Sequence, residues 1–479
     1  MTSTDRIRVL THADEPLRAD VVIIGSGAAG AAVAGEVSRA GASVVMIEAG
    51  GLPHDQHLGA HIRNSYPAES QLQTEFGPRI LANLVPYQHD PEPLPGLRGQ
   101  RFTHAVGGML TFWSHVCAVP DAATEAEPSI PLAELVELWD EAARLLWSEA
   151  GIGGVRHQRL VAALTAEIGD LPAGREVQGL PIGARRTADG SLQFSGIDAL
   201  LDGSDRAGEI QILAEHPARR IDHTGGRAHT VHTARADGSN PVAVSGDVVV
   251  VAAGALASPA VLWASGIRPP ALGRYLTDHT MLSSRVKLAE PVVEGVTETD
   301  ELFGVWIPSS SSRPVHTQVV PGWTTGLAFP GTPAWQTADI GQFIGVDPDP
   351  GNRLVFDDDH LDRWGLPSVQ AQFRLGETDR ARTHEAYADH ARVADAIRDR
   401  THGLSISLAA PGGSLHLMGS TRIGTDETSS ADPTGLIWGT DNVYVAGNGV
   451  LSTRNTSNPT LSMVALALRT ARTITGAGA

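Results

Sequence analysis

The first residues with types and spacing suited to chemistry form a glycine pattern near the start of the chain. DVVIIGSGAAG contains Gly25, Gly27 and Gly30 in the spacing G-x-G-x-x-G, after an apolar run and before an alanine-rich one. In a dinucleotide-binding turn the first glycine permits the tight turn, the second lets a pyrophosphate approach the backbone, and the third lets the helix pack closely on the strand. Glu48 ends the next apolar run, where a carboxylate would accept ribose hydroxyls. This context predicts a dinucleotide site, with a ligand-free glycine turn as the alternative.

A second candidate group lies in the last third of the chain. SLHLMGSTRIG places His416 before a glycine turn, and RNTSNPTLSMVALAL places Asn458 before an apolar helix that we expect to begin at Pro459. A histidine can take a proton from an alcohol near neutral pH, and an asparagine amide can donate a hydrogen bond to the same oxygen. A lone histidine is more often structural, and Ser457 or Asn458 would also serve as an ordinary helix cap. Capping and catalysis are compatible for Asn458, so both residues are candidates.

Three segments have the pattern of elements that would position these residues. Residues 20–50 fit a strand, a helix and a second strand, and both strands are continuous apolar runs typical of a parallel sheet covered on both faces. Residues 248–267 are long enough to span a membrane, but VVVVAAGALASP indicates a buried strand, a glycine turn and a helix with an early proline. The chain returns to its sheet after long insertions, which favours FAD over NAD. In THAVGGMLTFWSH, a Gly-Gly pair would let backbone lie against a flat ring, unless the loop is a plain turn.

The composition limits the classes of partner. The 479 residues, with 52 Gly and 30 Pro, indicate a loop-rich globular protein. The net charge of −18 argues against nucleic acid and anionic membrane surfaces. The single cysteine, Cys117, excludes an intrachain disulfide and a cysteine-based metal cluster, and no secretory signal is visible, so we expect a cytoplasmic protein. The acidic segment 347–365 lacks the EF-hand pattern and is predicted to be a solvated hairpin, so we expect no metal site.

Together these motifs resemble those of the glucose-methanol-choline (GMC) oxidoreductases. The matching pieces span the chain in the order of that family: VVIIGSGAAG with Glu48, VGGM at 106–109, VVVVAAGALASPAVL, GRYLTDH at 273–279, and HLMGSTRIG through SNPTLSMVALA. Within the family the chain is most similar to the branch of pyranose 2-oxidases and bacterial sugar and glycoside 3-oxidases. HTQ at 316–318, NRLVF at 352–356 and QFRLG around Arg374 resemble that branch.

The resemblance implies roles for particular residues. His416 would be the catalytic base or its partner, Asn458 the second member of the pair, and Gln318 and Arg374 the sugar-contacting side chains. The helix after Asn458 would place its positive end under the flavin pyrimidine. Beyond the three glycines of the turn, the implied FAD contacts are Glu48, Gly107, Gly108, Met109, Asn448, Pro459 and Thr460.

Two departures from the sugar-oxidase pattern change the expectations. Oxidases of this branch usually carry a histidine, covalently attached to the flavin, where this chain has Phe112 in GGMLTFWS. We therefore expect FAD to be bound noncovalently. The chain is also much shorter than the fungal enzymes and lacks the insertions that build their tetramer, so a monomer is expected.

We therefore expect an α/β fold of two domains. A discontinuous Rossmann-like FAD-binding domain would comprise residues 15–50, 100–120, 205–285 and 425–479, and an α+β substrate-binding domain with an antiparallel or mixed sheet would comprise residues 286–424. Residues 51–100 would cover the active site, and residues 121–204 would form a helical and loop connection.

The expected activity is FAD-dependent oxidation of a secondary hydroxyl of a pyranose sugar or glycoside to a ketone. Carbon 3 is favoured over carbon 2, with hydride transfer to flavin N5 and reoxidation by oxygen or another electron acceptor. Two alternatives stay open: a GMC oxidoreductase acting on a nonsugar alcohol, and a flavin-containing lyase in which FAD is structural.

Overall fold

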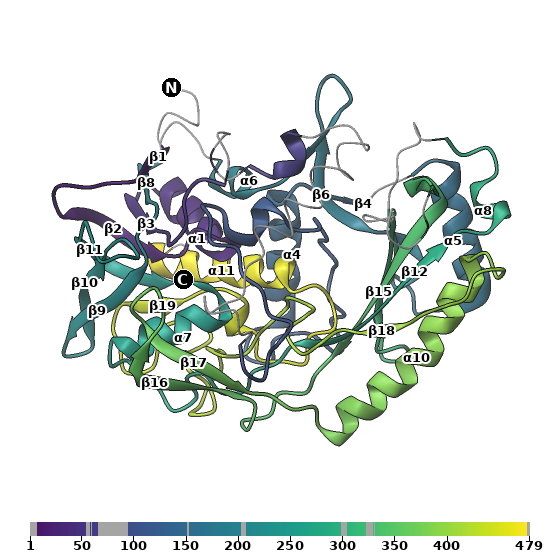
Figure 1. The fold of residues 1–479 in the computed structure, drawn as a ribbon. Coiled ribbons are helices and arrows are strands. Elements are labelled where there is room, and N and C mark those ends of the chain that lie inside the picture. Colours follow the sequence, from purple (N-terminus) through teal and green to yellow (C-terminus); the bar gives the residue numbers. More distant parts are fainter. Residues whose placement is uncertain are drawn as a thin grey trace.

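Two main sheets occupy opposite sides of the molecule in the computed structural model (Figure 1). The structure describes residues 7–53, 58, 60–65, 94–150, 153–202, 207–297, 304–321, 329 and 331–476. Of the predicted covering segment 51–100, residues 54–57, 59 and 66–93 lie outside these ranges. The covering role of that segment therefore stays a prediction.

The first sheet has eight strands in the order β1-β8-β3-β2-β11-β10-β9, with β19 also paired to β11. Its strands are β1 (Ile7–Leu10), β2 (Leu17–Ile24), β3 (Val44–Ile47), β8 (Ile210–Leu213), β9 (Ala218–Thr224), β10 (Arg227–Thr233), β11 (Val242–Val251) and β19 (Val443–Val445). Parallel pairing joins β1, β8, β3, β2, β11 and β19, while β10 and β9 add an antiparallel edge. The apolar runs at the ends of β2 and β11 and along β3 are buried, as their composition predicts.

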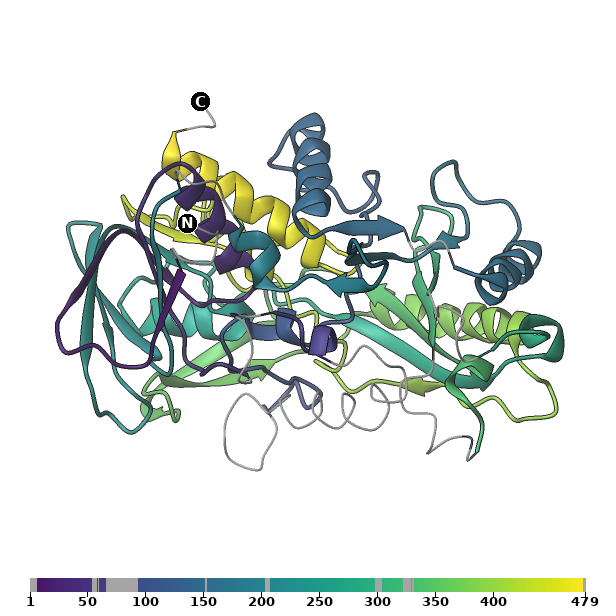
Figure 2. The ribbon, with the colours of Figure 1, turned by 90° about the horizontal axis from the view of Figure 1, so that it is seen from above.

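Helices pack on this sheet in the order expected for a dinucleotide-binding fold. Helix α1 (Ala28–Arg39) lies between β2 and β3 in the chain and packs against α6 (Ile197–Leu201) and α11 (Thr460–Thr475). Helix α11 in turn packs against α4 (Leu132–Leu145), as Figure 2 shows for the yellow and blue helices. The predicted strand, turn and helix of residues 248–267 are confirmed as β11 and α7 (Gly254–Ala264).

Helix α7 contains Pro259, which cannot donate a backbone hydrogen bond to the carbonyl of Ala255. The hydroxyl of Ser420 donates to that carbonyl instead, at 2.5 Å. Because Ser420 lies four residues after His416, this bond ties the start of α7 to the segment that carries the candidate base.

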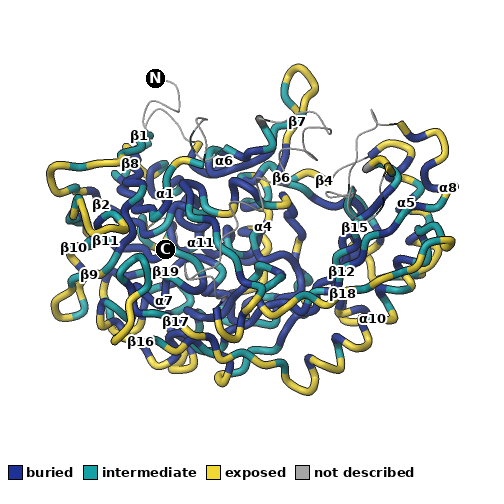
Figure 3. Tube along the Cα trace, viewed as in Figure 1, coloured by how far each residue is buried: buried dark blue, intermediate teal, exposed yellow. Residues whose placement is uncertain are grey.

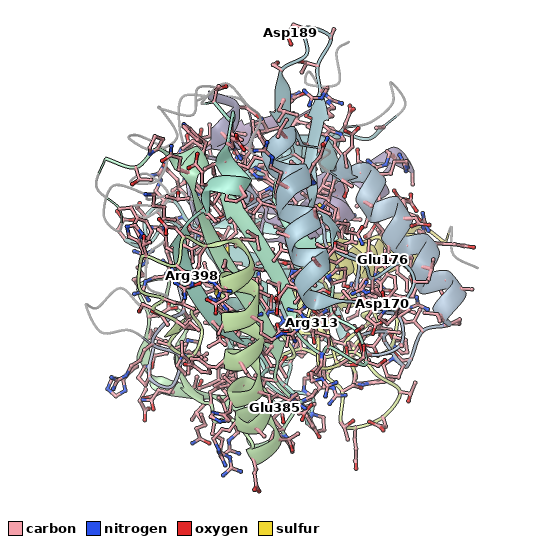
Figure 4. All side chains as sticks on the ribbon, turned by 90° about the vertical axis from the view of Figure 1, so that its right-hand side faces the viewer. Asp170, Glu176, Asp189, Arg313, Glu385 and Arg398 are labelled. Atoms are coloured by element: carbon pink, nitrogen blue, oxygen red, sulfur yellow. The ribbon has the colours of Figure 1, made fainter. Side chains whose placement is uncertain are left out.

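The second sheet is entirely antiparallel, in the order β18-β12-β15-β14-β13-β5. Its strands are β5 (Gln178–Gly179), β12 (His279–Lys287), β13 (Val305–Ile307), β14 (His316–Pro321), β15 (Thr337–Gly345) and β18 (Ser407–Leu408). Helices α5 (Val155–Ile168), α8 (Glu290–Val293) and α10 (Glu377–Ile397) accompany it, and a separate apolar core joins them to the strands. Figure 4 looks onto this side, where Glu385 marks the first half of α10 and Arg398 caps its C-terminal end.

The remaining described elements are small. They are the sheet β4 (Ser148–Ala150), β6 (Pro181–Arg186) and β7 (Leu192–Phe194), the hairpin β16 (Arg353–Leu361) and β17 (Pro367–Gln372), and the 3₁₀ turns η2 (Ile62–Ser65), η4 (Gly108–Thr111), η5 (Ala334–Gln336) and η6 (Asn448–Val450). The hairpin confirms the prediction for the acidic segment, and its outer edge is exposed (Figure 3). Its apolar side chains Leu354, Leu366 and Val369 nevertheless join the core of the first sheet.

The predicted fold class is confirmed: a Rossmann-like sheet is interrupted by insertions, and a second, antiparallel sheet follows.

Within the described ranges no helix is both long and apolar enough to cross a bilayer, and no group of three or more His, Cys, Asp or Glu side chains is arranged for a metal ion. Cys117 is buried in the core of the first sheet, where burial raises the pKa of its thiol to about 12.

The close packing at Gly30 gives a first testable expectation. A Cβ atom at Gly30 would lie 2.0 Å from the carbonyl oxygen of Gly25, a backbone atom that cannot turn aside. We expect Gly30→Ala to destabilise the protein by about 1–3 kcal/mol, as overpacked cores do, measured by thermal unfolding. Gly403→Ala is the matched control, because a Cβ there meets nothing within 4 Å. Equal melting temperatures for the two variants would contradict the close approach of α1 and β2.

Candidate active site

A cavity of about 520 Å³ joins the two candidate groups of residues. Gly25, Gly27 and Glu48 line it on the side of the first sheet, and His416 and Asn458 line it toward the second. The structure therefore brings together two motifs that are separated by most of the chain. Cavities of this size commonly hold small-molecule ligands or cofactors.

Three helices begin at this cavity. Gly27 and Ala28 at the start of α1, Gly254 at the start of α7 and Thr460 at the start of α11 all line it. Backbone N–H groups at helix N-termini carry partial positive charge and favour anionic ligands. The cavity is therefore suited to a ligand with phosphate groups or a ring that becomes negatively charged.

Glu48 connects the glycine turn to the Gly-Gly loop. Its carboxylate accepts hydrogen bonds from the Ser26 hydroxyl at 2.6 Å and from the Gly50 N–H at 2.8 Å. The Ser26 hydroxyl in turn accepts the N–H of Gly107 at 3.0 Å. Burial raises the pKa of Glu48, although these hydrogen bonds oppose the rise. The carboxylate is thus held at the cavity wall, with capacity to accept further hydroxyl groups.

The predicted cofactor-binding residues divide into those that face the cavity and those that shape it. Gly25, Gly27, Glu48, Gly108, Met109, Asn448, Pro459 and Thr460 line the cavity. Gly30 and Gly107 do not: Gly30 supports the approach of α1, and Gly107 adopts a φ of 96° that glycine accommodates without strain. All ten lie at the cavity or directly behind its wall.

The cavity fits a dinucleotide on two independent observations. A Cβ atom at Gly27 would meet nothing within 4 Å, so the backbone there borders open space of the kind that a pyrophosphate needs. Among the cavity-lining side chains, the buried atoms Asn448 Oδ1, Thr103 Oγ1 and Gln100 Oε1 have no hydrogen-bond partner within the described part of the chain. Buried polar atoms are normally paired, so these three indicate a polar ligand.

His416 is held by a short irregular segment that a buried carboxylate fixes. Asp278 accepts hydrogen bonds from the N–H of Gly412 at 2.8 Å and from the hydroxyl of Ser414. The Ser414 oxygen accepts the N–H of His416 at 3.2 Å. Leu415, between them, has a φ of 63°, a conformation that non-glycine residues rarely adopt. The position of His416 therefore depends on Asp278.

The ring of His416 lies between His279 and Asn458. Its Nδ1 is 2.9 Å from Nδ1 of His279, and its Nε2 is 3.3 Å from the amide nitrogen of Asn458. Burial, followed by the nearby His279 and His316, holds the pKa of His416 well below its usual value. His416 is therefore neutral near pH 7 and able to accept a proton.

Asn458 is held by a second buried carboxylate, that of Glu125. Glu125 accepts the backbone N–H groups of Thr456 at 3.0 Å and Ser457 at 2.8 Å, and also the Ser457 hydroxyl at 3.1 Å. The expectation that Ser457 or Asn458 caps the last helix with its side chain is wrong, because both side chains are bonded elsewhere. Helix α11 begins at Thr460, one residue later than predicted, with Pro459 as its N-cap.

The two predicted sugar-contacting residues have different surroundings. Gln318 lies behind the cavity wall, where its amide nitrogen donates to Asn458 Oδ1 and lies 2.8 Å from Nε2 of His316. Arg374 is not brought to this cavity: its side chain is 79% exposed and pairs with Asp349 beside the β16–β17 hairpin. The structure thus gives Gln318 a place next to the pair and leaves Arg374 outside it.

Sequence reasoning missed four residues that hold the pair: Glu125, Asp278, His279 and His316. His316 had a usable signal, because residues two apart on a strand share a face and Gln318 had been singled out. Asp278 and His279 end the GRYLTDH segment, which carried the family resemblance without a role for either. Glu125 sits among other acidic residues in DAATEAEP and had no distinguishing signal.

Comparison with known proteins identifies the class. Models of the GMC oxidoreductase family match residues 185–281 and 348–467. A C-glycoside 3-oxidase from Microbacterium trichothecenolyticum is 32% identical over 96% of this chain and 97% of its own length. The chain belongs to the GMC oxidoreductase family, which implies FAD as its cofactor.

Two further relatives extend the comparison. A pyranose 2-oxidase from Tricholoma matsutake is 28% identical over 82% of this chain and 76% of its own. Among solved structures, pyridoxine 4-oxidase from Mesorbium loti has a TM-score of 0.66 at 17% identity, covering 95% of this chain and 98% of that one. This last similarity shows the shared fold alone.

The buried carboxylate of Asp278 predicts a pH dependence of stability. Burial raises its pKa from 3.8 to about 6, against the hydrogen bonds that it accepts. Between these pH values the unfolded chain releases the proton while the folded chain keeps it, so stability falls as pH rises from about 4 to about 6. At about 1.4 kcal/mol per pKa unit, the loss from this group is about 3 kcal/mol.

Asp278→Asn removes this titration and retains an acceptor for Gly412. We expect the stability of the variant relative to wild type to improve by about 3 kcal/mol between pH 4 and pH 7, measured by urea unfolding across that range. Parallel pH curves for the two proteins would show that Asp278 does not titrate in this way.

Proposed function

We propose that this protein oxidises a secondary hydroxyl of a pyranose sugar or glycoside to a ketone, preferentially at carbon 3. FAD, when bound, would supply the hydride acceptor, and oxygen or another electron acceptor would take up the electrons afterwards. The residues of the chain bind and orient the substrate, hold its hydroxyl and remove its proton.

The observation that carries the proposal is the His416–Asn458 pair at the cavity. The Nε2 atom of His416 and the amide nitrogen of Asn458 are 3.3 Å apart, so one hydroxyl oxygen could contact both. His416 would take the hydroxyl proton, and Asn458 would donate a hydrogen bond to the oxygen. Loss of hydride from a neutral alcohol would leave positive charge on carbon, so removal of the proton stabilises the transition state.

The sugar class rests on the relatives rather than on polar side chains at the cavity. The C-glycoside 3-oxidase similarity extends over almost the whole of both chains. Neither of the two expected sugar-contacting residues favours a sugar over another alcohol, because Gln318 lies behind Asn458 and Arg374 is exposed elsewhere. A nonsugar alcohol is therefore the alternative to test alongside sugars. We also infer a monomer, since the arm insertions of the fungal enzymes are missing from the sequence.

FAD is proposed to be held noncovalently by the cradle described above. Phe112, at the position where sugar oxidases carry the attached histidine, lines the cavity and offers no nucleophilic atom. His104 is another histidine that lines the cavity. Its backbone packs against Gly50, at the Glu48 end of the cavity, so it does not take the place of the attached histidine at position 112.

Acid precipitation of the purified protein tests the noncovalent attachment. We expect the yellow colour to remain in the supernatant, with the absorbance spectrum of free FAD. Phe112→His is the informative companion, since it restores the nucleophile at the same position. Colour retained in the wild-type pellet would refute noncovalent binding.

Anaerobic reduction of the flavin tests the reaction itself. We expect C- and O-glycosides or free sugars to bleach the flavin, with the product ketone located by NMR. His416→Ala should retain FAD and slow reduction by about 10²–10⁴-fold, with the residual rate rising at high pH as solvent takes the proton. Asn458→Ala should show a smaller loss, because it orients the oxygen without accepting the proton.

The exposed His384 on α10 provides the matched control, and His384→Ala should reduce at the wild-type rate. A His416→Ala variant that reduces its flavin as fast as wild type would remove His416 from the mechanism. A flavin that no sugar bleaches but a nonsugar alcohol does would replace the substrate class. A flavin that no alcohol bleaches would favour the lyase.

A further inference from the structure

A continuous series of polar contacts connects the catalytic pair to two fixed ends inside the protein. One end is the indole N–H of Trp306 on β13, and the other is the main-chain carbonyl of Asn455. Between them lie, in order, the side chains of His316, Gln318, Asn458, His416 and His279. Which atoms carry hydrogen in this series decides where a proton taken from substrate can go.

The chemistry of the two ends is unambiguous. An indole nitrogen can only donate, so His316 Nδ1, 3.0 Å from Trp306, must accept. A carbonyl oxygen can only accept, so His279 Nε2, 2.9 Å from Asn455, must donate. Each neutral imidazole has one N–H and one lone pair, so both rings are constrained at their other nitrogen.

From the Asn455 end, the hydrogen positions follow one by one. Neutral His279 keeps a lone pair on Nδ1, and His416 Nδ1 donates to it at 2.9 Å. His416 Nε2 is then a lone pair and accepts the Asn458 amide N–H at 3.3 Å. Asn458 Oδ1 accepts the amide N–H of Gln318. In this half of the series, the unprotonated Nε2 atom of His416 is therefore the basic atom at the cavity.

From the Trp306 end, the same rule leads to a conflict. Neutral His316 accepts at Nδ1 and so carries its hydrogen on Nε2, which faces the amide nitrogen of Gln318 at 2.8 Å. Two donors then face each other. In the neutral state the series therefore cannot pair all its contacts, and a buried mismatch of this kind is costly.

One added proton removes the conflict. If the amides of Gln318 and Asn458 turn over, Gln318 Oε1 accepts from both His316 and Asn458, and Asn458 Oδ1 accepts from His416 Nε2–H. His416 Nδ1 then accepts from His279 Nδ1–H. His279 donates at both nitrogens, and every contact has one donor and one acceptor. Complete pairing thus requires one added proton on the His416–His279 pair, and His279 holds it against the carbonyl oxygen of Asn455, which accepts the hydrogen bond of its other nitrogen.

We propose that His279 is the resting place of the proton that the substrate hydroxyl loses, reached through His416. The O–H bond breaks as an N–H bond forms at His416 Nε2. The Nδ1–H bond of His416 breaks as an N–H bond forms at Nδ1 of His279, and His279 becomes the cation. The O–H electron pair becomes part of the new C=O bond, and the C–H pair leaves with the hydride. The proposal rests on the proposed function, and His279 acts through His416 without touching substrate.

The surroundings of His279 agree with a proton that is absent at rest. Burial lowers the pKa of His279 to about 4 and holds the pKa values of His416 and His316 well below the usual range. The titratable groups near it are His416, His316 and the adjacent Asp278, whose carboxylate is directed at Gly412 and Ser414. The positive charges of Arg175 and Arg313 also lower the pKa of His316. The cation therefore forms when a reaction supplies the proton.

Nitrogen-15 NMR of the holoenzyme labelled in histidine tests the two protonation states. In the oxidised enzyme at pH 7 we expect His279 to carry hydrogen on Nε2 only and His416 on Nδ1 only. After anaerobic reduction by substrate we expect His279 to carry hydrogen on both nitrogens and His416 on Nε2. A resting His416 with its hydrogen on Nε2, or a His279 that stays singly protonated after reduction, overturns the proposal.

His279→Asn separates proton storage from support of the ring. An asparagine oxygen at the Nδ1 position still accepts the His416 Nδ1–H and cannot take up a proton. We expect flavin reduction to slow by about 10²-fold near neutral pH and to recover as pH rises. His390→Asn, at a buried histidine that contacts Ser284 on β12, is the matched control and should keep the wild-type pH profile. An unchanged rate and pH profile in His279→Asn would reduce His279 to a structural role.

The two proposals fail in different ways. If no alcohol reduces the wild-type flavin, the proposed function fails. If an alcohol reduces the flavin but His279 stays singly protonated, or His416 rests with its hydrogen on Nε2, the relay alone fails.

Discussion

The cofactor half of the site depends on one row of aligned residues in the first sheet. Ile47, Ile24, Val251 and Val445 are register partners across β3, β2, β11 and β19. Because these strands are parallel, all four leave the sheet at the same level and the same edge, where ligands of open α/β sheets bind. A slip of one residue between β2 and β11 would turn their apolar side chains over and separate the N-termini of α1 and α7. The convergence of helix N-termini therefore follows from strand register.

The half of the site that holds His416 and Asn458 is built by a different principle. His416 and Asn458 lie on irregular segments, and neither has secondary structure of its own to fix it. Two buried carboxylates, Asp278 and Glu125, fix these segments by accepting their N–H and hydroxyl groups. Burying charge is costly unless hydrogen bonds compensate for it, and here the compensating donors are the groups that need to be held. Precision in the site is thus obtained at the expense of stability.

The sequence predicted those features that depend on local pattern. The glycine turn, Glu48, the apolar strands and the β11–α7 unit each have a signature within a few residues, and the structure has them where expected. The start of α11 was misplaced by one residue because Ser457 and Asn458 make tertiary hydrogen bonds in preference to local ones. Glu125 and Asp278 could not be assigned, since their partners are remote in the chain and acidic residues are usually solvated. Arg374 lies two residues after the end of β17, and nothing local distinguishes an exposed arginine there from one directed at a ligand.

The solitary thiol of Cys117 has a practical consequence. It is fully buried in the core of the first sheet, and burial raises its pKa to about 12, so the reactive thiolate is almost absent while the chain is folded. A thiol reagent can reach it only when that core opens. The rate of alkylation at this one sulfur atom therefore reports how often the core opens. Mass spectrometry can follow this rate without any introduced label. It would measure how far the bound cofactor slows that opening.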